Sequence, residues 1–531
     1  MSLEKDDDFN KDDIIKRLKG KGKDANRMIT YVEFLFSPPV FMLLGILNFK
    51  FIFKRGHPAY NRIKLYGIFM YASDQNVYTL TGVSYLCRND ELLKCFTNGI
   101  TPSPNCLDDF LRKSSRWVMK AISICTLVEL NDLECLDFKR IYCDSTDAKI
   151  NGSVNYKVKL IDLKCFKLLK KWNLLHNGTA FKMNKNRKKL EKLLKTYEND
   201  EEMVKNIKHI LKHYGLYRKT AYRKYDVFKK YLDEDPEGYV CVMFPEARFM
   251  KTKRGRFEFA LLIQQCMLKK GIVLPGLLQS KPNDGNSLEE IITDLKETFS
   301  ILERLQRYYG TRRNYKEIHN ALELTIMILD SGYFTDANLE AAYDHNLNVL
   351  IMPRIIARRI NDNLRGKKLN NMEYLIEENM KKITKKHTDI TGKGYVCPYG
   401  VHSEDCVEKE INSAFNRLRE GQPEVFKEVS YNYDFNCPAD CPLKDTCTIN
   451  PIEDRISVLK HEMISKFTNK RYREIYSERF SANEQIFADY KGLIEIIKLL
   501  GSNQTAAQNH LYILNTCRNL KRKVSIKDSI N

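Results

Sequence analysis

Three acidic residues that lie far apart in the chain could together hold metal ions. Asp144 ends FKRIYCDST, which alternates like a strand, and Asp330 ends the apolar run from Leu324 to Leu329. Glu484 lies on the helix predicted for SANEQIFADYKGLIEIIKLL. Phosphodiester cleavage by in-line attack uses two divalent ions about 3.5–4 Å apart, and Mg²⁺ prefers oxygen ligands. The three carboxylates therefore predict a site for two Mg²⁺ ions, with Mn²⁺ as a substitute. Strands also end in Asp simply at turns, so the pattern alone leaves that interpretation open.

Four cysteines in a polar, loop-rich segment could bind a second kind of metal. A tetrahedral set of thiolates is typical of structural zinc, and the same ligands suit an iron–sulfur cluster. His402 or Cys406 could replace one of the four, and reduced cysteines in a compact loop are the alternative interpretation. The four predicted zinc ligands are Cys397, Cys437, Cys441 and Cys447.

The elements that would position these side chains are predicted to alternate between helix and strand. Residues 60–120 have the apolar spacing of helices, interrupted by a turn at Gly99 to Pro104. Later, a helix follows three strand-like runs, and a second helix, capped by Thr335, separates two more strands. This order predicts a mixed or parallel sheet with helices on its faces. The strand-like runs are Tyr239 to Phe244, Phe257 to Cys266, Lys270 to Leu278, Leu324 to Leu329 and Leu347 to Met352.

Length and composition set the class of protein. The chain has 531 residues, of which 43% are hydrophobic and 29% charged. With this composition we expect neither a disordered tail nor a membrane protein. Its most apolar stretch, Pro38 to Phe53, is shorter than the roughly 20 residues of a membrane span, and we expect a buried helix there. The first 30 residues are too polar for a secretory signal. The cysteines outside the cluster are too sparse for a disulfide scaffold. We expect a cytoplasmic protein in a reducing compartment, with no membrane partner.

The net charge of +20 favours a polyanionic partner, with nucleic acid first. Residues 156–230 hold 22 Lys and Arg against 7 Asp and Glu, which is +15 of that total. Basic residues supply phosphate contacts and aromatic rings can stack on bases, so the interleaved stretch from Tyr214 to Tyr225 predicts DNA contact. The alternative is a solvated helical unit whose tyrosines form its own core. The basic residues predicted to bind DNA are Arg218, Lys219, Arg223 and Lys224.

Three motifs together resemble the insertion-sequence DDE transposases of bacteria and archaea, in the branch with a cysteine-rich insert before the catalytic Glu. YCDSTDAKINGS resembles the family's first-Asp motif, and ILDSGYFTDANLE resembles its DSGY-x-[ST]-x-x-N-L motif closely. YSERFSANEQIFADYKG resembles the Tyr-Arg-Glu-Lys signature, although its Arg-to-Glu interval is one residue longer than the commonest form. The resemblance covers about residues 60–523. The signature residues would be Tyr476, Arg479, Glu484 and Lys491, with Glu474 and Glu478 as alternative third carboxylates.

The resemblance implies an α/β fold with an RNase H-like mixed-sheet catalytic core. A helical N-terminal domain and two inserts would surround that core. The implied divisions are a helical domain at 1–125, the start of the core at 126–155, a basic helical insert at 156–235, the continued core at 236–362, a cysteine-containing insert at 363–455 and completing C-terminal helices at 456–531.

The resemblance also implies an activity. Asp144, Asp330 and Glu484 would hold the metal ions for cleavage at the ends of an insertion sequence, and the freed 3′-hydroxyl would then attack target DNA. Tyr476, Arg479 and Lys491 would contact DNA. The implied partners are terminal inverted repeats, target DNA and further copies of the chain, close to the nucleoid. A transposase-derived DNA-binding protein that no longer cuts, and a metal-dependent nuclease of the same fold, remain alternatives.

Overall fold

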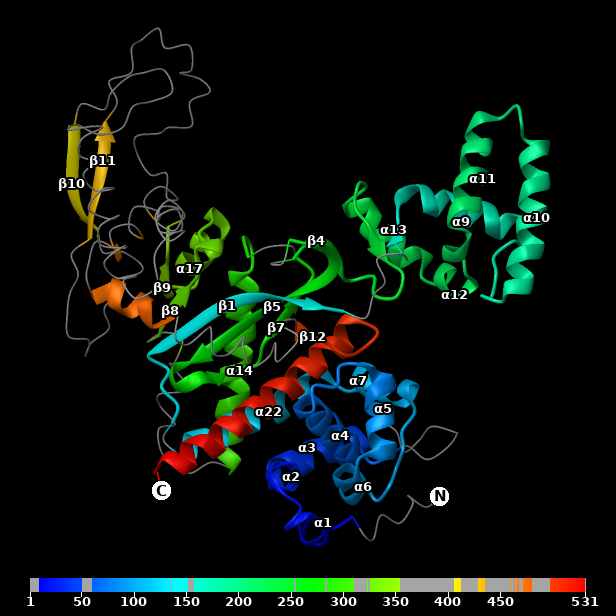
Figure 1. The fold of residues 1–531 in the computed structure, drawn as a ribbon. Coiled ribbons are helices and arrows are strands. Elements are labelled where there is room, and N and C mark those ends of the chain that lie inside the picture. The colour runs from blue at the N-terminus through cyan, green and yellow to red at the C-terminus, as the bar shows by residue number, and fades with distance from the viewer. Residues whose placement is uncertain are drawn as a thin grey trace, which may run out of the picture.

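The computed structural model describes most of the chain outside its later part. It covers 9–49, 60–133, 135–150, 157–252, 255–281, 284–309, 325–353, 405–411, 428–434, 471–479 and 497–530, with single positions between 322 and 467. Side chains are not described at 48–49, 405–411, 428–434, 497 and 529–530. Within these limits the chain is mostly helical, with one mixed sheet and a helical N-terminal region (Figure 1).

The described part of the N-terminal region contains eight helices, and side-chain caps explain several of their boundaries. Thr79, Asp90 and Ser103 each accept a hydrogen bond from a backbone N–H in the first turn of the helix that follows. Asn98 and Gly99 have positive φ, which ends one helix and starts the predicted turn. The helical prediction for 60–120 is confirmed. The helices are α1 (Lys11–Leu18), α2 (Lys23–Leu35), α3 (Pro38–Phe49), α4 (Arg62–Asp74), α5 (Leu80–Asn89), α6 (Glu91–Thr97), α7 (Pro104–Lys113) and α8 (Arg116–Asp132).

The apolar helix expected from Pro38 onward is only half buried. Leu43, Leu44 and Leu47 of α3 are in the core, whereas Phe41 and Ile46 are 49% and 46% exposed. No single described helix is long and apolar enough to cross a membrane; α2 and α3 pass that test only as a pair, which is bent by 75°.

The sheet has the strand order β4-β5-β1-β8-β9. The central strand β1 is antiparallel to β5 and parallel to β8, and β8 is parallel to β9. Short strands β6 and β7 pair with β5, and β12 pairs with the far end of β1. The strands are β1 (Arg140–Lys149), β4 (Arg248–Lys251), β5 (Phe257–Leu268), β6 (Ile272–Val273), β7 (Leu277–Gln279), β8 (Ile326–Leu329), β9 (Asn348–Ile351) and β12 (Ile497–Lys498). The prediction of a mixed sheet is confirmed.

Three strand predictions are wrong in their extent. The run from Tyr239 to Phe244 forms only the two-residue strand β3 (Val240–Cys241), which pairs with β2 (Lys157–Val158) in a separate sheet. β1 does not end at Asp144 but continues to Lys149, because that half is paired with β5 through Ala260. The run from Lys270 to Leu278 is two short strands, β6 and β7, separated by 274–276. Strand patterns carry no information on where a neighbouring strand continues the pairing.

Both faces of the sheet are buried, each against its own set of helices. Ile141 and Cys143 of β1 face the core shared with α8, α14 (Leu288–Tyr309) and α17 (Asp336–Asp344). Tyr142 faces a second core, which also contains Tyr476 from the helical residues 471–479. Since side chains alternate along a strand, Asp144 points to the same face as Tyr142. The sheet thus presents Asp144 to the helix that carries the predicted signature.

The lysine-rich segment forms a helical unit with a core of its own. Its helices lie between β2 (Lys157–Val158) and β3 (Val240–Cys241), which pair antiparallel. Phe166, Tyr214 and Tyr217 are in its hydrophobic core, which is separate from the two cores of the sheet. Figure 1 shows the unit beside the sheet. The helices are α9 (Leu160–Lys171), α10 (Ala180–Thr196), α11 (Glu201–His213), α12 (Lys219–Tyr222) and α13 (Tyr225–Glu234), inside the predicted insert at 156–235.

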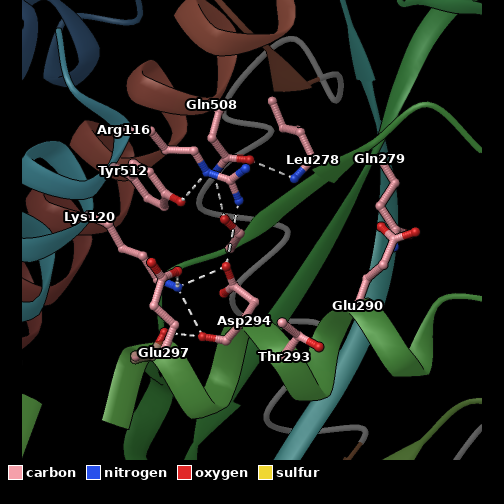
Figure 2. Close-up of polar contacts among 12 residues, drawn as sticks. Arg116, Lys120, Leu278, Gln279, Glu290, Thr293, Asp294, Glu297, Gln508 and Tyr512 are labelled. Atoms are coloured by element: carbon pink, nitrogen blue, oxygen red, sulfur yellow. Dashed lines mark hydrogen bonds and ion pairs between the residues drawn. The ribbon is translucent and has the colours of Figure 1, made fainter. Parts of the chain in front are cut away.

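The last helix, α22 (Gln504–Ile530), joins the N-terminal helices to the sheet. On one side Asn509 donates to the carbonyl oxygens of Leu111 and Ser114, at 2.7 and 3.1 Å. On the other side Gln508 accepts from the Leu278 backbone N–H at 2.8 Å (Figure 2). A single helix therefore supplies polar contacts to two regions, of which one lies 398 residues and the other 230 residues before the contacting residue of the helix.

A buried ion pair fixes α8 to α14, as Figure 2 shows. Lys120, 1% exposed, donates to Asp294 at 2.8 Å and to Glu297 at 2.7 Å. Burial raises the pKa of Asp294, although Lys120 opposes the shift. Arg116 adds a second positive charge 3.7 Å from the Asp294 carboxylate. A charged pair this deep is sensitive to the loss of either partner.

His510 on α22 should make the fold sensitive to acid. Its side chain is fully buried, and burial lowers its pKa to about 3. The folded chain keeps the ring neutral while the unfolded chain protonates it below about pH 6.5, so folding stability falls as the pH falls. Between pH 6.5 and 5 this one group should remove about 2 kcal/mol, at about 1.4 kcal/mol per pH unit.

The His510→Gln variant tests this assignment by urea unfolding at pH 7 and pH 5. Gln retains an acceptor for the Leu500 N–H, which lies 3.2 Å from the His510 ring nitrogen. The stability loss between the two pH values should be about 2 kcal/mol smaller in the variant than in the wild type. Equal losses in the two proteins would contradict the assignment.

Candidate metal and DNA site

The register of two parallel strands brings the two predicted aspartates together. The pairing of β1 with β8 ends at Cys143 opposite Leu329. Asp144 and Asp330 are the next residue of each strand, and parallel neighbours lie about 4.8 Å apart. On the side of β1 that faces β8, pairing resumes only at Ala148, with β12. The two carboxylates therefore stand where the sheet opens between β8 and β12.

Arg479 bridges these two carboxylates. One guanidinium nitrogen lies 3.1 Å from Asp144 Oδ2 and another 3.6 Å from Asp330 Oδ1. The Arg479 side chain is 8% exposed, that of Asp144 14% and that of Asp330 44%. One cation thus contacts both acids, with the Asp144 side chain mostly buried and the Asp330 side chain open to solvent. The sequence grouped Asp144, Asp330 and Arg479 through motifs alone, and the structure brings all three into contact.

Local backbone contacts orient each aspartate. Asp144 Oδ1 accepts from the Ser145 N–H at 2.8 Å, and Asp330 Oδ1 accepts from the Ser331 N–H at 2.6 Å. Asp330 also begins the short 3₁₀ turn η3 (Ser331–Tyr333). These contacts hold the carboxylates before any ligand arrives, which lowers the cost of organising a metal site.

A fourth acidic residue, Asp284, lies against both motifs and was not predicted. Its carboxylate accepts from Ser145 Oγ at 2.8 Å and from Gln264 Nε2 at 3.0 Å. Its backbone oxygen accepts from the Asn338 side chain in the second motif. In sequence Asp284 belongs to PNDGN, which has the composition of an ordinary turn. Only the folded structure shows that this turn reaches Ser145, the neighbour of Asp144.

The same contact explains why the second motif needs Gly and Tyr. A Cβ atom at Gly332 would lie 3.0 Å from Asp284 Oδ2, so a larger residue would push that carboxylate away. Tyr333 is fully buried and donates its hydroxyl to Gln264, which in turn donates to Asp284. Burial first, and then the charge of Asp284, raise the pKa of Tyr333 well above its usual range. The hydroxyl therefore stays a donor.

The electrostatics of the site favour a cation. Burial by itself lowers the pKa of Arg479, but Tyr476, Asp144 and Asp330 raise it above its usual range, so the guanidinium stays charged. One positive charge then faces the two carboxylates of Asp144 and Asp330. Carboxylate oxygens are the donors that Mg²⁺ prefers. Within the described ranges no group of three or more His, Cys, Asp or Glu is placed to hold a metal, and Glu484 lies outside those ranges.

Of the two alternative third carboxylates, Glu478 has other partners. It accepts from the Tyr142 hydroxyl at 2.7 Å and forms an ion pair with Arg140. Although burial opposes them, these two contacts lower the pKa of Glu478. Glu474 is exposed, one helical turn before Glu478. Glu478 thus anchors the helix to β1, and Glu484 remains the predicted third metal ligand.

The buried ring of Tyr476 lies close to the guanidinium of Arg479. The Tyr476 ring is 1% exposed, lies 5.1 Å from the Phe467 ring and 5.9 Å from the Arg479 guanidinium carbon. A ring this deeply buried has no surface for DNA, so the predicted DNA contact of Tyr476 is replaced by a positioning role. Lys491 lies outside the described residues.

The predicted DNA-binding residues of the insert are divided in the structure. Arg218, Lys219 and Arg223 are exposed. Lys224 instead donates to the carbonyl oxygens of Val242 and Met243, both at 3.1 Å, and burial lowers its pKa. Lys224 therefore ties α13 to the end of β3 and is unsuited to phosphate contact. The tyrosines form the unit's own core, as the alternative interpretation expected: Tyr214 and Tyr217 are fully buried.

The predicted zinc ligands Cys397, Cys437, Cys441 and Cys447 lie outside the described residues, as does His402. The backbone of Cys406 belongs to β10 (Asp405–Ile411), which pairs with β11 (Glu428–Asp434). The ten cysteines with described side chains are free thiols. Two of them, Cys143 and Cys266, face each other across β1 and β5, with sulfur atoms 3.0 Å apart.

Comparison with protein-family models, with curated proteins and with solved structures finds no match to this chain. The functional assignment therefore depends on the residues themselves.

Proposed function

We propose that this protein is a DDE transposase with an RNase H-like catalytic core. The observation that carries the proposal is the pair Asp144 and Asp330 at one register step beyond the β1–β8 ladder, bridged by Arg479. The motifs predicted this grouping from three distant segments. The sheet supports it, since its first strand is central, with an antiparallel neighbour on one side and parallel neighbours on the other.

The chemistry proposed is cleavage of DNA at the ends of an insertion sequence, followed by strand transfer. Bound Mg²⁺ would lower the pKa of a water molecule and stabilise the leaving 3′-oxygen. Asp144 and Asp330, together with Glu484, would bind two such ions. Their carboxylates are already aimed by Ser145 and Ser331. The second step, attack of the freed 3′-hydroxyl on target DNA, would use the same residues.

Arg479 has a distinct role in this proposal. In the absence of metal its guanidinium balances the two carboxylates, which would otherwise repel each other at close range. When cations occupy the acids, the same guanidinium can turn toward a DNA phosphate, which it would bind with two parallel hydrogen bonds. Tyr476 beneath it limits how far the side chain moves.

The test is to incubate the full chain with Mg²⁺ or Mn²⁺ and linear DNA that carries both flanks of its reading frame. We expect cleavage at inverted repeats in those flanks and products in which the freed ends are joined to target DNA. Cleaved but never joined ends would identify a nuclease. Binding without cleavage in either metal would identify a DNA-binding protein that has lost catalysis. The predicted zinc site is checked separately, by metal analysis of the purified chain.

A further inference from the structure

Helix α10 carries the most one-sided positive surface described in the chain. Its 17 residues contain six lysines and one arginine against a single acid, Glu191. All six lysines are exposed, and none of them has a carboxylate partner among the described residues. By contrast, Lys164 on α9 and Lys229 on α13 are paired with Glu202 and Asp233. The charge of α10 is therefore not neutralised within the insert.

Four of these lysines form one row along the outer side of α10. Their spacing of three, four and three residues keeps them on one helix face, over a rise of about 15 Å. Glu191 lies off this row. The lysine row is Lys185, Lys188, Lys192 and Lys195.

The rotation of α10 about its axis is fixed by contacts on the opposite face. Leu190 is fully buried there. Asn186 donates to the Leu174 carbonyl oxygen at 3.0 Å and to the Tyr214 hydroxyl at 2.9 Å. Because these contacts hold the inner face against the core of the insert, the lysine row must face solvent. Figure 1 shows α10 at the edge of the insert farthest from β1.

An exposed aromatic residue lies at the start of the row. Phe181 is four residues before Lys185, on the same face, and its side chain is 78% exposed. Water exposure of a whole phenyl ring is unfavourable, by about 25 cal/mol per Å² of apolar surface. Beside a row of lysines, such a ring suits a partner that offers phosphates and flat, apolar bases or sugars.

We propose that the lysine row and Phe181 form a docking surface for duplex DNA, separate from the metal site. The proposal rests on the proposed function for its choice of nucleic acid. Duplex DNA carries one phosphate charge per about 1.7 Å of its axis, so a row of about 15 Å can contact several phosphates at once. The four lysines supply charge and Phe181 supplies an apolar contact. This surface would hold DNA that flanks the cleavage site, because α10 lies at the outer edge of the insert.

The experiment measures binding of the full chain to a linear duplex of about 30 base pairs in EDTA, where no cleavage occurs, across a series of salt concentrations. In the row variant, Lys185, Lys188, Lys192 and Lys195 are all changed to Gln. The control variant carries the same charge change on other exposed lysines of the same unit, Lys205, Lys208, Lys212 and Lys230. Helical content by circular dichroism checks that both fold.

We expect the row variant to bind at least tenfold more weakly near 0.1 M salt. It should also lose up to about 3.6 units of slope in log K against log salt, at about 0.9 for each of four phosphate contacts. The control variant should lose far less. Phe181→Ala should weaken binding without changing the slope, because it removes no charge.

Equal losses in the row and control variants would mean that net charge alone drives binding, and would overturn the proposal. So would wild-type affinity in the row variant, although DNA cleavage would then still support the proposed function. Stronger binding of the wild type to poly-glutamate than to the duplex would point to an acidic protein partner and would also overturn it. If the wild type neither binds nor cuts DNA, the proposed function itself fails.

Discussion

Changing Asp144 or Asp330 to Asn should abolish Mg²⁺-dependent DNA cleavage. Asn keeps the shape of each side chain but supplies a neutral oxygen, so the charge that attracts a divalent cation is lost. Loss of a residue that only orients a metal ligand typically costs 10–100-fold in activity or metal affinity, and loss of a ligand itself should exceed that, at roughly 1000-fold or more. The measurement is the initial rate of cleavage at the element's ends. Glu484→Gln should have an effect of the same order.

Two acidic neighbours provide matched controls. Asp147 lies on the same strand as Asp144, three residues later. Because side chains alternate along a strand, Asp147 points to the other face of the sheet. Glu478 already serves Tyr142 and Arg140. Asp147→Asn should cleave at near the wild-type rate, and Glu478→Gln should lower stability more than the rate. The metal assignment fails if Asp330→Asn retains wild-type activity, or if Glu478→Gln is inactive while Glu484→Gln is not.

Lys120→Met should be the most destabilising single change outside the metal site. Met keeps the length of the side chain but leaves Asp294 buried and without its ammonium partner. Removing one member of a buried pair costs about 3–5 kcal/mol. The measurement is the shift in the urea midpoint of unfolding. The control variant Lys523→Met breaks the ion pair between Lys523 and Glu129, whose side chains are 22% and 25% exposed. It should lower the free energy of unfolding by at most about 1 kcal/mol.

The pH dependence of this variant gives a second check. Burial raises the pKa of Asp294, and removal of Lys120, which opposes the shift, should raise it further. A protonated Asp294 carries no charge, so the loss of stability should be smaller at pH 5 than at pH 8. The double change Lys120→Met with Asp294→Leu should recover most of the loss, because an apolar pair replaces a charged one. A pH-independent loss that the second change does not rescue would contradict this account.

The sequence predicts the central part of the site well because short motifs encode it. Asp330 follows a continuous apolar run, and the last four residues of that run form strand β8 in the structure. Thr335 was expected to cap the next helix, and its side chain accepts from the Asn338 N–H there. Each of these features depends on fewer than about ten consecutive residues, which is the range where pattern and propensity act.

The features that the sequence did not predict depend on residues brought together from afar. Asp284 is remote from Ser145 in sequence, and nothing in its turn marks that contact. The role of the interleaved basic and aromatic stretch from Tyr214 to Tyr225 is ambiguous in the sequence for another reason. An aromatic residue at helical spacing can face a nucleic acid or its own core, and only the packing of α9 against α11 decides for the core.

The position of α22 has a consequence for how the protein is made. Asn509 bonds to Leu111, 398 residues earlier, so the N-terminal helices leave the ribosome long before the helix that covers them. At about 5–20 residues per second, that interval is roughly 20–80 s. During translation the uncovered apolar faces of α4 and α8 would be exposed to solvent, and a chaperone that shields nascent chains would protect them. The yield of folded protein in a cell is then set by synthesis and chaperone protection as much as by final stability.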